Sequence, residues 1–424
     1  MVLRSGIITI GAIILLVLGL ALGWRAHTRG RFHRIKAELG QDNTPHAATT
    51  PKPGGQEAIV LERSPIEGGA APEFTSATIL PGRGMNILQI TAELPGRGKV
   101  NLLASPTLEQ ADKQMNGTGE DAGGGASLAM GGAVEAPWAG RLFGTPLEGG
   151  LTARWNEDTI EIPVATQQSG KAWAEGGLIL ANQATDIKSN VMPDGGEAEG
   201  VYTFSDDDKV WPSATKVKTT VQLSGRTFNL KIVATNTGNR PEPVGLGWRP
   251  RFAVLDSDRR TMRLRLPSVT KQETGDSRAG APTGRLLSVE GSSQDFSAME
   301  GRELGKNTLD GTFVNLRQAA LDSGPVAELW DPENQFGLRI TMLSAAIKAI
   351  HVSAPADQGF VMLAPRFNYD DPFGEEWPKD GKAGMVTLQP GASIQWSIRM
   401  EIYGPARAPG AQRSSRAAPA YSPV

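Results

Sequence analysis

Residues 393–402 read SIQWSIRMEI, with an apolar side chain at every second position. Successive side chains of a β-strand point to opposite faces, so a period of two predicts a strand that buries one face. Residues 218–234 repeat the pattern on both sides of the dipeptide Ser224-Gly225, which predicts a β-hairpin. The two segments together indicate antiparallel β-structure.

The rest of the chain supports the same fold class. Four more segments predict strands, the last two as a neighbouring pair: residues 85–94, 262–266, 335–343 and 346–353. Long helical periodicity is missing, while 51 glycines and 29 prolines suit many turns between short strands. The polar, glycine-rich segments 109–132 and 271–305 are predicted to be surface loops. We therefore expect an all-β protein, one large antiparallel β-sandwich.

Composition excludes several classes of function. A net charge of −2 over 424 residues offers no basic surface for phosphates, so no nucleic-acid partner is expected. The chain has no cysteine, which removes disulfides, thiolate metal sites and cysteine nucleophiles. Of the four histidines, only His351 follows residue 46. Neither a phosphate-binding loop nor histidine metal spacing occurs, and we predict no cofactor and no metal site.

The N-terminus carries an apolar run. Residues 6–24 are uncharged and, as a helix, about long enough to cross a bilayer core of roughly 30 Å. The run exceeds the usual apolar region of a signal peptide, which favours a transmembrane anchor. A cleaved signal peptide, with Ala21 and Gly23 near the cleavage site, remains the alternative. The predicted layout is an anchor over 1–24, a flexible tether over 25–73, a domain over 74–403 and a disordered tail over 404–424.

This layout predicts a single-pass, membrane-anchored protein with the membrane as a partner. Five basic residues follow the apolar run, which by the positive-inside rule favours a cytoplasmic domain. A short N-terminal tail before a β-rich domain is instead typical of export. We expect an extracytoplasmic, periplasmic domain and leave both orientations open.

Four segments, taken in order, resemble the aldose 1-epimerase (galactose mutarotase-like) family. Residues 131–144, GGAVEAPWAGRLFG, resemble its Pro-(Trp/Phe)-Ala-Asn-Arg-(Ile/Leu) motif. Residues 236–252, NTGNRPEPVGLGWRPRF, resemble its Pro-x-Pro-x-Gly-x-Gly-x-His-Pro-Tyr-Phe motif. Residues 76–103 and 360–403 resemble the opening and closing strands. No single motif is specific, but together they span 74–403 and indicate a divergent member.

The resemblance implies a two-sheet supersandwich that binds a sugar in a cleft. In the family a glutamate base and a histidine acid open the sugar ring. Here Arg249 occupies the position of that histidine and Ala364 the position of that glutamate. Alanine cannot take a proton, and arginine stays protonated at any usable pH. We therefore predict no catalytic residues at the family positions, and a carbohydrate-binding protein that is weak or inactive as a mutarotase.

The sugar contacts implied by the resemblance are better preserved. Arg141 matches the arginine of the family's Asn-Arg pair, although Gly140 replaces the asparagine. Asp310, in LDGTFVNL, matches a sugar-contacting aspartate. Arg249 can still hydrogen-bond a hydroxyl, and Trp248 and Trp138 offer flat apolar faces. A salt bridge, a turn aspartate and core packing are the corresponding structural alternatives.

Two other features bear on function. The acidic run NYDDPFGEEW, residues 368–377, is interpreted as a solvated loop, with a substitute base or a cation site as alternatives. His351 is expected to be packed within its strand. Besides carbohydrate binding, two hypotheses remain: an active isomerase with relocated groups, such as Glu375 or Glu376, and a structural envelope protein that uses the sandwich for protein contacts.

Overall fold

The computed structural model describes residues 50–405 except 67–68, 169–170, 205–208, 276–279 and 379–382. From Pro51 onward the chain forms one compact unit. The predicted anchor over residues 6–24 lies outside the described residues, as does the predicted tail from residue 406 on. Among the residues that are described, no helix is both long and apolar enough to cross a membrane.

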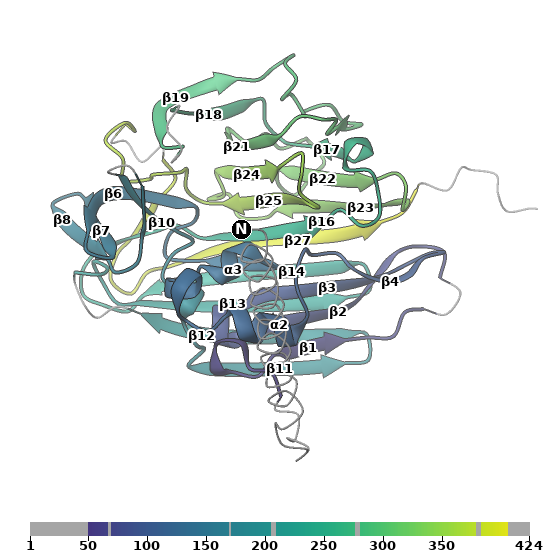
Figure 1. Ribbon diagram of the computed structural model, residues 1–424, viewed down its shortest axis with the longest axis horizontal. Coiled ribbons are helices and arrows are strands. Elements are labelled where there is room, and N and C mark those ends of the chain that lie inside the picture. The colour runs from purple at the N-terminus through teal and green to yellow at the C-terminus, as the bar shows by residue number, and fades with distance from the viewer. Residues whose placement is uncertain are drawn as a thin grey trace, which may run out of the picture. The chain divides into compact units, whose positions relative to one another are not determined.

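Two large antiparallel sheets dominate the described part of the chain (Figure 1). The first has eleven strands. Its order is β1 (Ile59–Glu62), β2 (Glu73–Leu80), β3 (Asn86–Leu94), β5 (Gly132–Glu135), β16 (Gly247–Ala253), β25 (Phe360–Arg366), β24 (Ala349–Ala354), β21 (Leu309–Val314), β18 (Thr270–Thr274) and β19 (Pro282–Ser288), with β4 (Gly98–Asn101) beside β3.

The second sheet has nine strands and lies over the first, so that strands of both sheets run across the view in Figure 1. Its order is β11 (Asp186–Met192), β12 (Gly195–Phe204), β13 (Thr215–Ser224), β14 (Thr227–Asn236), β27 (Ser393–Tyr403), β23 (Phe336–Met342), β22 (Val326–Asp331), β17 (Arg263–Arg265) and β20 (Arg302–Glu303). The expected all-β, antiparallel class is confirmed.

Smaller elements complete the described fold. A five-stranded sheet has the order β8 (Asp158–Ile162), β7 (Gly150–Trp155), β6 (Arg141–Leu147), β10 (Lys171–Glu175) and β9 (Thr166–Gln168). A two-stranded sheet joins β15 (Glu242–Val244) to β26 (Val386–Leu388). The helices are α2 (Leu108–Gln114), α3 (Ala126–Ala129) and short 3₁₀ turns at Pro53–Gly55, Pro81–Arg83, Gly119–Gly124, Ile179–Ala181 and Arg259–Thr261.

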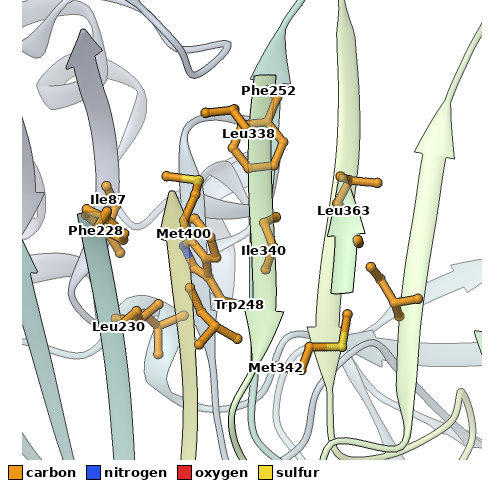
Figure 2. Packing of buried hydrophobic residues seen from close by; sticks show 14 of the residues in the cluster. Ile87, Phe228, Leu230, Trp248, Phe252, Leu338, Ile340, Met342, Leu363 and Met400 are labelled. Carbon is orange, nitrogen blue, oxygen red and sulfur yellow. The ribbon is translucent and has the colours of Figure 1, made fainter. Parts of the chain in front are cut away.

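The core lies between the two large sheets, because alternate side chains of both sheets point into the same space. In the nine-stranded sheet, Phe228 pairs with Met400 across β14 and β27, and both are fully buried. Figure 2 shows these side chains packed with Ile87 and Trp248 of the facing sheet. The predicted hairpin and closing strand are thus confirmed as the centre of the second sheet.

One predicted strand pairing is wrong. Both strands predicted over 335–343 and 346–353 exist, but β23 belongs to the nine-stranded sheet and β24 to the eleven-stranded sheet. The short connection crosses between the sheets. Leu343 N donates to Ser397 O in one sheet, and Lys348 N donates to Arg366 O in the other. A local alternation pattern predicts a strand but does not identify its partner.

Three segments predicted to lack regular structure contain ordered elements. Residues 109–132 hold α2 and α3, and Asp121 forms a buried ion pair of 2.6 Å with Arg83. Residues 271–305 contribute β18, β19 and β20. Within the predicted tether, β1 pairs antiparallel with β2, so the sheet begins before residue 74. Polar composition hid these elements because edge strands and short helices bury little apolar surface.

Candidate functional site

The face of the eleven-stranded sheet that points away from the core carries the candidate site. On β25, Val361 and Leu363 point into the core, so Ala364 points to the opposite face. On β24, Ile350 and Val352 point into the core, so His351 also lies on the opposite face. His351 is packed, with 14 % of its side chain exposed, but on the face that carries the candidate site.

Backbone register aligns the two residues that the resemblance places at the acid and base positions. The register of β16 and β25 sets Arg249 level with Ala364. His351 pairs with Ala364 on the next strand, and Thr312 pairs with His351 on the strand after that. Arg249 and Ala364 are thus neighbours, and the one histidine beyond residue 46 lies directly beside Ala364.

Arg141 and Arg249 converge on Glu175. The Arg249 guanidinium donates a hydrogen bond to Glu175 Oε1, and Arg141 Nε lies 4.0 Å from the same oxygen. Arg141 begins β6 and Glu175 ends β10, where the two residues pair in register. Burial alone would raise the pKa of Glu175, but the two guanidinium charges outweigh it and the pKa is lowered. Glu175 is therefore a carboxylate at neutral pH.

Asp310 and His351 form a second pair on the same face. His351 Nε2 lies 3.3 Å from Asp310 Oδ1, and the Asp310 side chain is 58 % exposed. Partial burial opposes ionisation of Asp310, but the hydrogen bond with His351 and the charge of Arg141 outweigh it, so the pKa of Asp310 is lowered. Arg141 thus lies within electrostatic reach of Asp310. The predicted residues Arg141, Arg249 and Asp310 therefore share one polar cluster.

Thr312 connects His351 to the rest of the cluster. Its hydroxyl donates to Asp370 Oδ2 at 2.7 Å and lies 2.9 Å from His351 Nδ1. The imidazole is consequently held at both nitrogens, between Thr312 and Asp310.

Arg366 lies at the centre of the cluster, although it was not predicted. It is buried and donates to Asp370 Oδ2 at 2.7 Å and to Thr312 Oγ1 at 2.6 Å. Gly140 makes room for it, since a Cβ at that position would lie 1.7 Å from Arg366 Nη1. The glycine that replaces the motif's asparagine is therefore required by the Arg366 guanidinium. The sequence did carry a signal for Arg366, because it lies two residues after Ala364 and hence on the same face.

Glu135 is the second residue that was missed. It ends β5 fully buried, and its Oε1 accepts a hydrogen bond of 3.2 Å from Gly140 N. Burial outweighs the nearby charges of Arg249 and Arg366, so the pKa of Glu135 is raised. Nothing in the sequence distinguished Glu135 from a surface residue of a turn. We define the polar cluster as Glu135, Arg141, Glu175, Arg249, Asp310, Thr312, His351, Arg366 and Asp370.

The acidic run over residues 368–377 is not a fully solvated loop. Asp370 belongs to the polar cluster, and the buried Asp371 accepts a hydrogen bond of 3.1 Å from Phe143 N through its Oδ1. Glu375 is exposed. Within the described residues, no group of three or more His, Asp or Glu side chains is arranged to hold a metal ion.

The two predicted tryptophans lie in the interior. Trp248 is 0 % exposed, stacks on Phe228 at 5.8 Å and points into the core in Figure 2. Trp138 is 1 % exposed and stacks on Trp211 at 5.5 Å. Neither ring has a face open to a sugar. We therefore no longer propose Trp248 or Trp138 as a sugar contact.

A different aromatic pair borders the cluster. Phe143 and Trp173 pair in register on β6 and β10, with ring centroids 6.1 Å apart, and both are partly exposed. Each lies two residues from the pair Arg141 and Glu175, hence on the same face of this small sheet. These rings, not those of Trp138 and Trp248, supply apolar surface beside the charged groups.

Comparison with known proteins agrees with this geometry. The model of the aldose 1-epimerase family matches residues 152–401, more than half of the chain, and the protein belongs to this family. No curated protein matches the sequence.

Solved structures show the same fold at low identity. A galactose mutarotase-like protein from Clostridium acetobutylicum has a TM-score of 0.63 and 16 % identity, covering 82 % of this chain and 99 % of that chain. An aldose epimerase homologue from C. elegans has a TM-score of 0.60, 16 % identity and the same coverages. A putative aldose 1-epimerase from Escherichia coli K12 has a TM-score of 0.57 and 14 % identity, again covering 82 % and 99 %. The fold is therefore galactose mutarotase-like, and the chain is a divergent member.

Proposed function

We propose that this protein binds a carbohydrate at the polar cluster and does not catalyse mutarotation as its family does. One observation carries the proposal: Arg249 and Ala364, the residues that the resemblance assigns to the acid and base positions, lie level on neighbouring strands, and Glu175 holds Arg249 in an ion pair. Loss of one general acid or base costs roughly 10²–10⁴ in rate, and here both are replaced. Family membership supports a carbohydrate-related ligand.

The charge balance of the cluster favours a neutral sugar over an acidic or sulfated one. Arg249 is paired with Glu175, and Arg366 with Asp370. Arg251 keeps its positive charge, but its guanidinium donates to Ala129 O at 2.6 Å and lies 3.9 Å over the Phe360 ring. Arginine and carboxylate groups of this kind hydrogen-bond sugar hydroxyls without requiring a charged ligand.

Two substitutions test the binding site. Arg141→Ala and Asp310→Ala should each weaken binding of glucose or galactose by about 1–3 kcal/mol, the usual loss for a charged hydrogen bond. Calorimetric titration measures the loss, with Arg154→Ala and Asp194→Ala as controls because both residues are exposed. Thermal stability should change little. A large fall in melting temperature with unchanged binding would instead make Arg141 and Asp310 structural residues.

A second candidate function is an isomerase with relocated groups. The observation that favours it is the position of His351, which pairs with Ala364 and contacts Asp310. A histidine and carboxylate pair can donate and accept protons during ring opening. Glu375 is exposed and Glu376 lies beside Asp371, so the groups first considered for this role fit it less well. The two candidates differ in one quantity, the rate of mutarotation.

We also propose that residues 6–24 anchor the chain in a membrane with the domain on the extracytoplasmic side. The support is the uncharged run itself, which is long enough to span a bilayer. Full-length protein should be recovered in the membrane fraction, and protease added to spheroplasts should cleave the domain. Recovery of unprocessed full-length protein in the soluble fraction would refute the anchor, and protection from protease until lysis would reverse the orientation.

A further inference from the structure

A pocket of about 800 Å³ borders the polar cluster, and Glu175 lines it. Trp173 lines the same pocket and lies two residues before Glu175 on β10, so both side chains are on one face of the small sheet. The pocket is thus adjacent to the proposed sugar contacts. Its volume is near the upper end of the range of ligand pockets, roughly 300–1,000 Å³.

The side chains around this pocket are mainly apolar. They include Leu128, Ile162, Val164, Trp173, Leu178 and Leu180. Few polar side chains take part, and two of them already have partners. Asn182 Nδ2 donates to Leu178 O at 3.0 Å, and Glu175 accepts from Arg249. The polar side chains that line the pocket are Glu120, Thr166, Glu175 and Asn182, so a second sugar ring would depend on backbone groups for most of its hydrogen bonds.

We propose that the ligand is a glycoside, with its sugar ring at the polar cluster and an apolar aromatic aglycone in this pocket against Trp173. This inference rests on the proposed carbohydrate function and adds a ligand class to it. An aromatic aglycone can stack on the Trp173 ring. This ring packs against Phe143 of the neighbouring strand, which keeps it in place. The sugar supplies the hydroxyls for Arg141 and Asp310, and the aglycone supplies the apolar surface.

Titration of matched glycosides tests the proposal. Full-length protein in phosphatidylcholine nanodiscs is titrated with the methyl and phenyl β-D-galactosides and glucosides, with empty nanodiscs as the blank. The phenyl glycoside should bind at least about tenfold more tightly than the methyl glycoside, equal to about 1.4 kcal/mol.

Two exposed valines provide the variant and its control. Val164→Glu places a charge at the rim of the pocket, where Val164 is 39 % exposed. It should bring the phenyl affinity close to the methyl affinity and leave the methyl affinity unchanged. Val191→Glu, at a position that is 58 % exposed on β11, should preserve the difference.

The remaining outcomes separate the two proposals. Equal binding of methyl and phenyl glycosides overturns the aglycone pocket and leaves the sugar site standing. A phenyl preference that Val164→Glu does not reduce also overturns it, because the ring then binds elsewhere. A disaccharide of the same sugar that equals the phenyl glycoside and is equally sensitive to Val164→Glu overturns it in favour of a second sugar. If neither glycoside binds, the proposed function and the inference both fail.

Discussion

Arg249 shows how one residue changes the chemistry of the site. Burial opposes its charge, but the carboxylates of Glu175 and Glu135 outweigh burial, and the pKa of Arg249 is raised. A guanidinium whose pKa is above its already high ordinary value cannot donate a proton at neutral pH. Ala364, level with it on the next strand, has no titratable group at all. The pair can position a hydroxyl but cannot transfer a proton.

Gly140 provides a residue-scale prediction about the centre of the cluster. Gly140→Ala should lower the free energy of unfolding by about 3–5 kcal/mol, because the new Cβ displaces Arg366 and breaks its buried ion pair with Asp370. Gly149→Ala is the control, since it has a similar φ of +75° but no atom within 4 Å of its Cβ. The control should lower the free energy of unfolding only by the cost of placing alanine in the left-handed region, about 1–2 kcal/mol. Urea denaturation measures both, and equal losses would contradict the packing of Arg366 over Gly140.

The motifs predicted the arginines and Asp310 better than the tryptophans. Arg141, Arg249 and Asp310 were placed by their positions in family motifs, and the structure brings them into one cluster. Trp248 could have been excluded from the sequence, because it is adjacent to Arg249 in a strand and must point to the opposite face. Arg366 and Glu135 were missed because their roles depend on residues distant in sequence, Thr312 for Arg366 and Arg249 for Glu135.

At the scale of elements, hydrogen bonds join the segment after β25 to β6 and so hold the polar cluster together. Asp371 N donates to Arg141 O at 2.8 Å, and Asp371 Oδ1 accepts from Phe143 N. Asp371 adopts φ of +49°, in the left-handed region. This connection orients Arg141 towards Glu175, so the segment positions a proposed ligand contact as well as closing the fold.

This connection predicts a dependence of stability on pH. Burial and the neighbouring Glu376 carboxylate raise the pKa of Asp371 from 3.8 to about 7, although the Phe143 N–H opposes the shift and Asp370 adds to it. A carboxyl whose pKa is raised in the folded state binds more protons folded than unfolded, so stability falls as pH rises from about 4 to about 7. Asp371→Asn should flatten this fall, since an amide keeps the hydrogen bond and tolerates positive φ.

Thermal denaturation of both proteins between pH 5 and pH 8 measures the effect. The unsubstituted protein should lose stability towards pH 8, and the Asp371→Asn variant should lose less. Glu375→Gln is the matched control because Glu375 is exposed and lies on the same segment. Parallel pH profiles for the protein and the Asp371→Asn variant would show that Asp371 is ionised in the folded state at pH 5.

The positions of strands were easier to predict than the strands with which they pair. The period of two located β14, β23, β24 and β27 because one face of each is buried in the core. The pattern could not show that β23 and β24 lie in different sheets, since pairing is decided by contacts far apart in sequence. The edge strand β19 and its neighbour β18 were missed for a related reason: few of their side chains are buried, so their sequences carry little apolar alternation.

At the scale of the whole fold, one face of the eleven-stranded sheet forms the core and the other carries the polar cluster. The strand register and the buried core side chains fix this division, but a fold does not determine chemistry. The side chains at the cluster determine it, and Arg249 and Ala364 are the residues that the resemblance places at the acid and base positions. The central claim is therefore that the protein retains a sugar site without the family's catalysis.

Polarimetry of freshly dissolved α-D-glucose and α-D-galactose at neutral pH tests that claim most directly. With purified full-length protein, optical rotation should change at the rate of buffer alone, because neither Arg249 nor Ala364 exchanges a proton. Clear acceleration by the unsubstituted protein would contradict the claim. If that acceleration disappeared in His351→Gln but persisted in the exposed control Glu375→Gln, the relocated pair of His351 and Asp310 would be the catalyst instead.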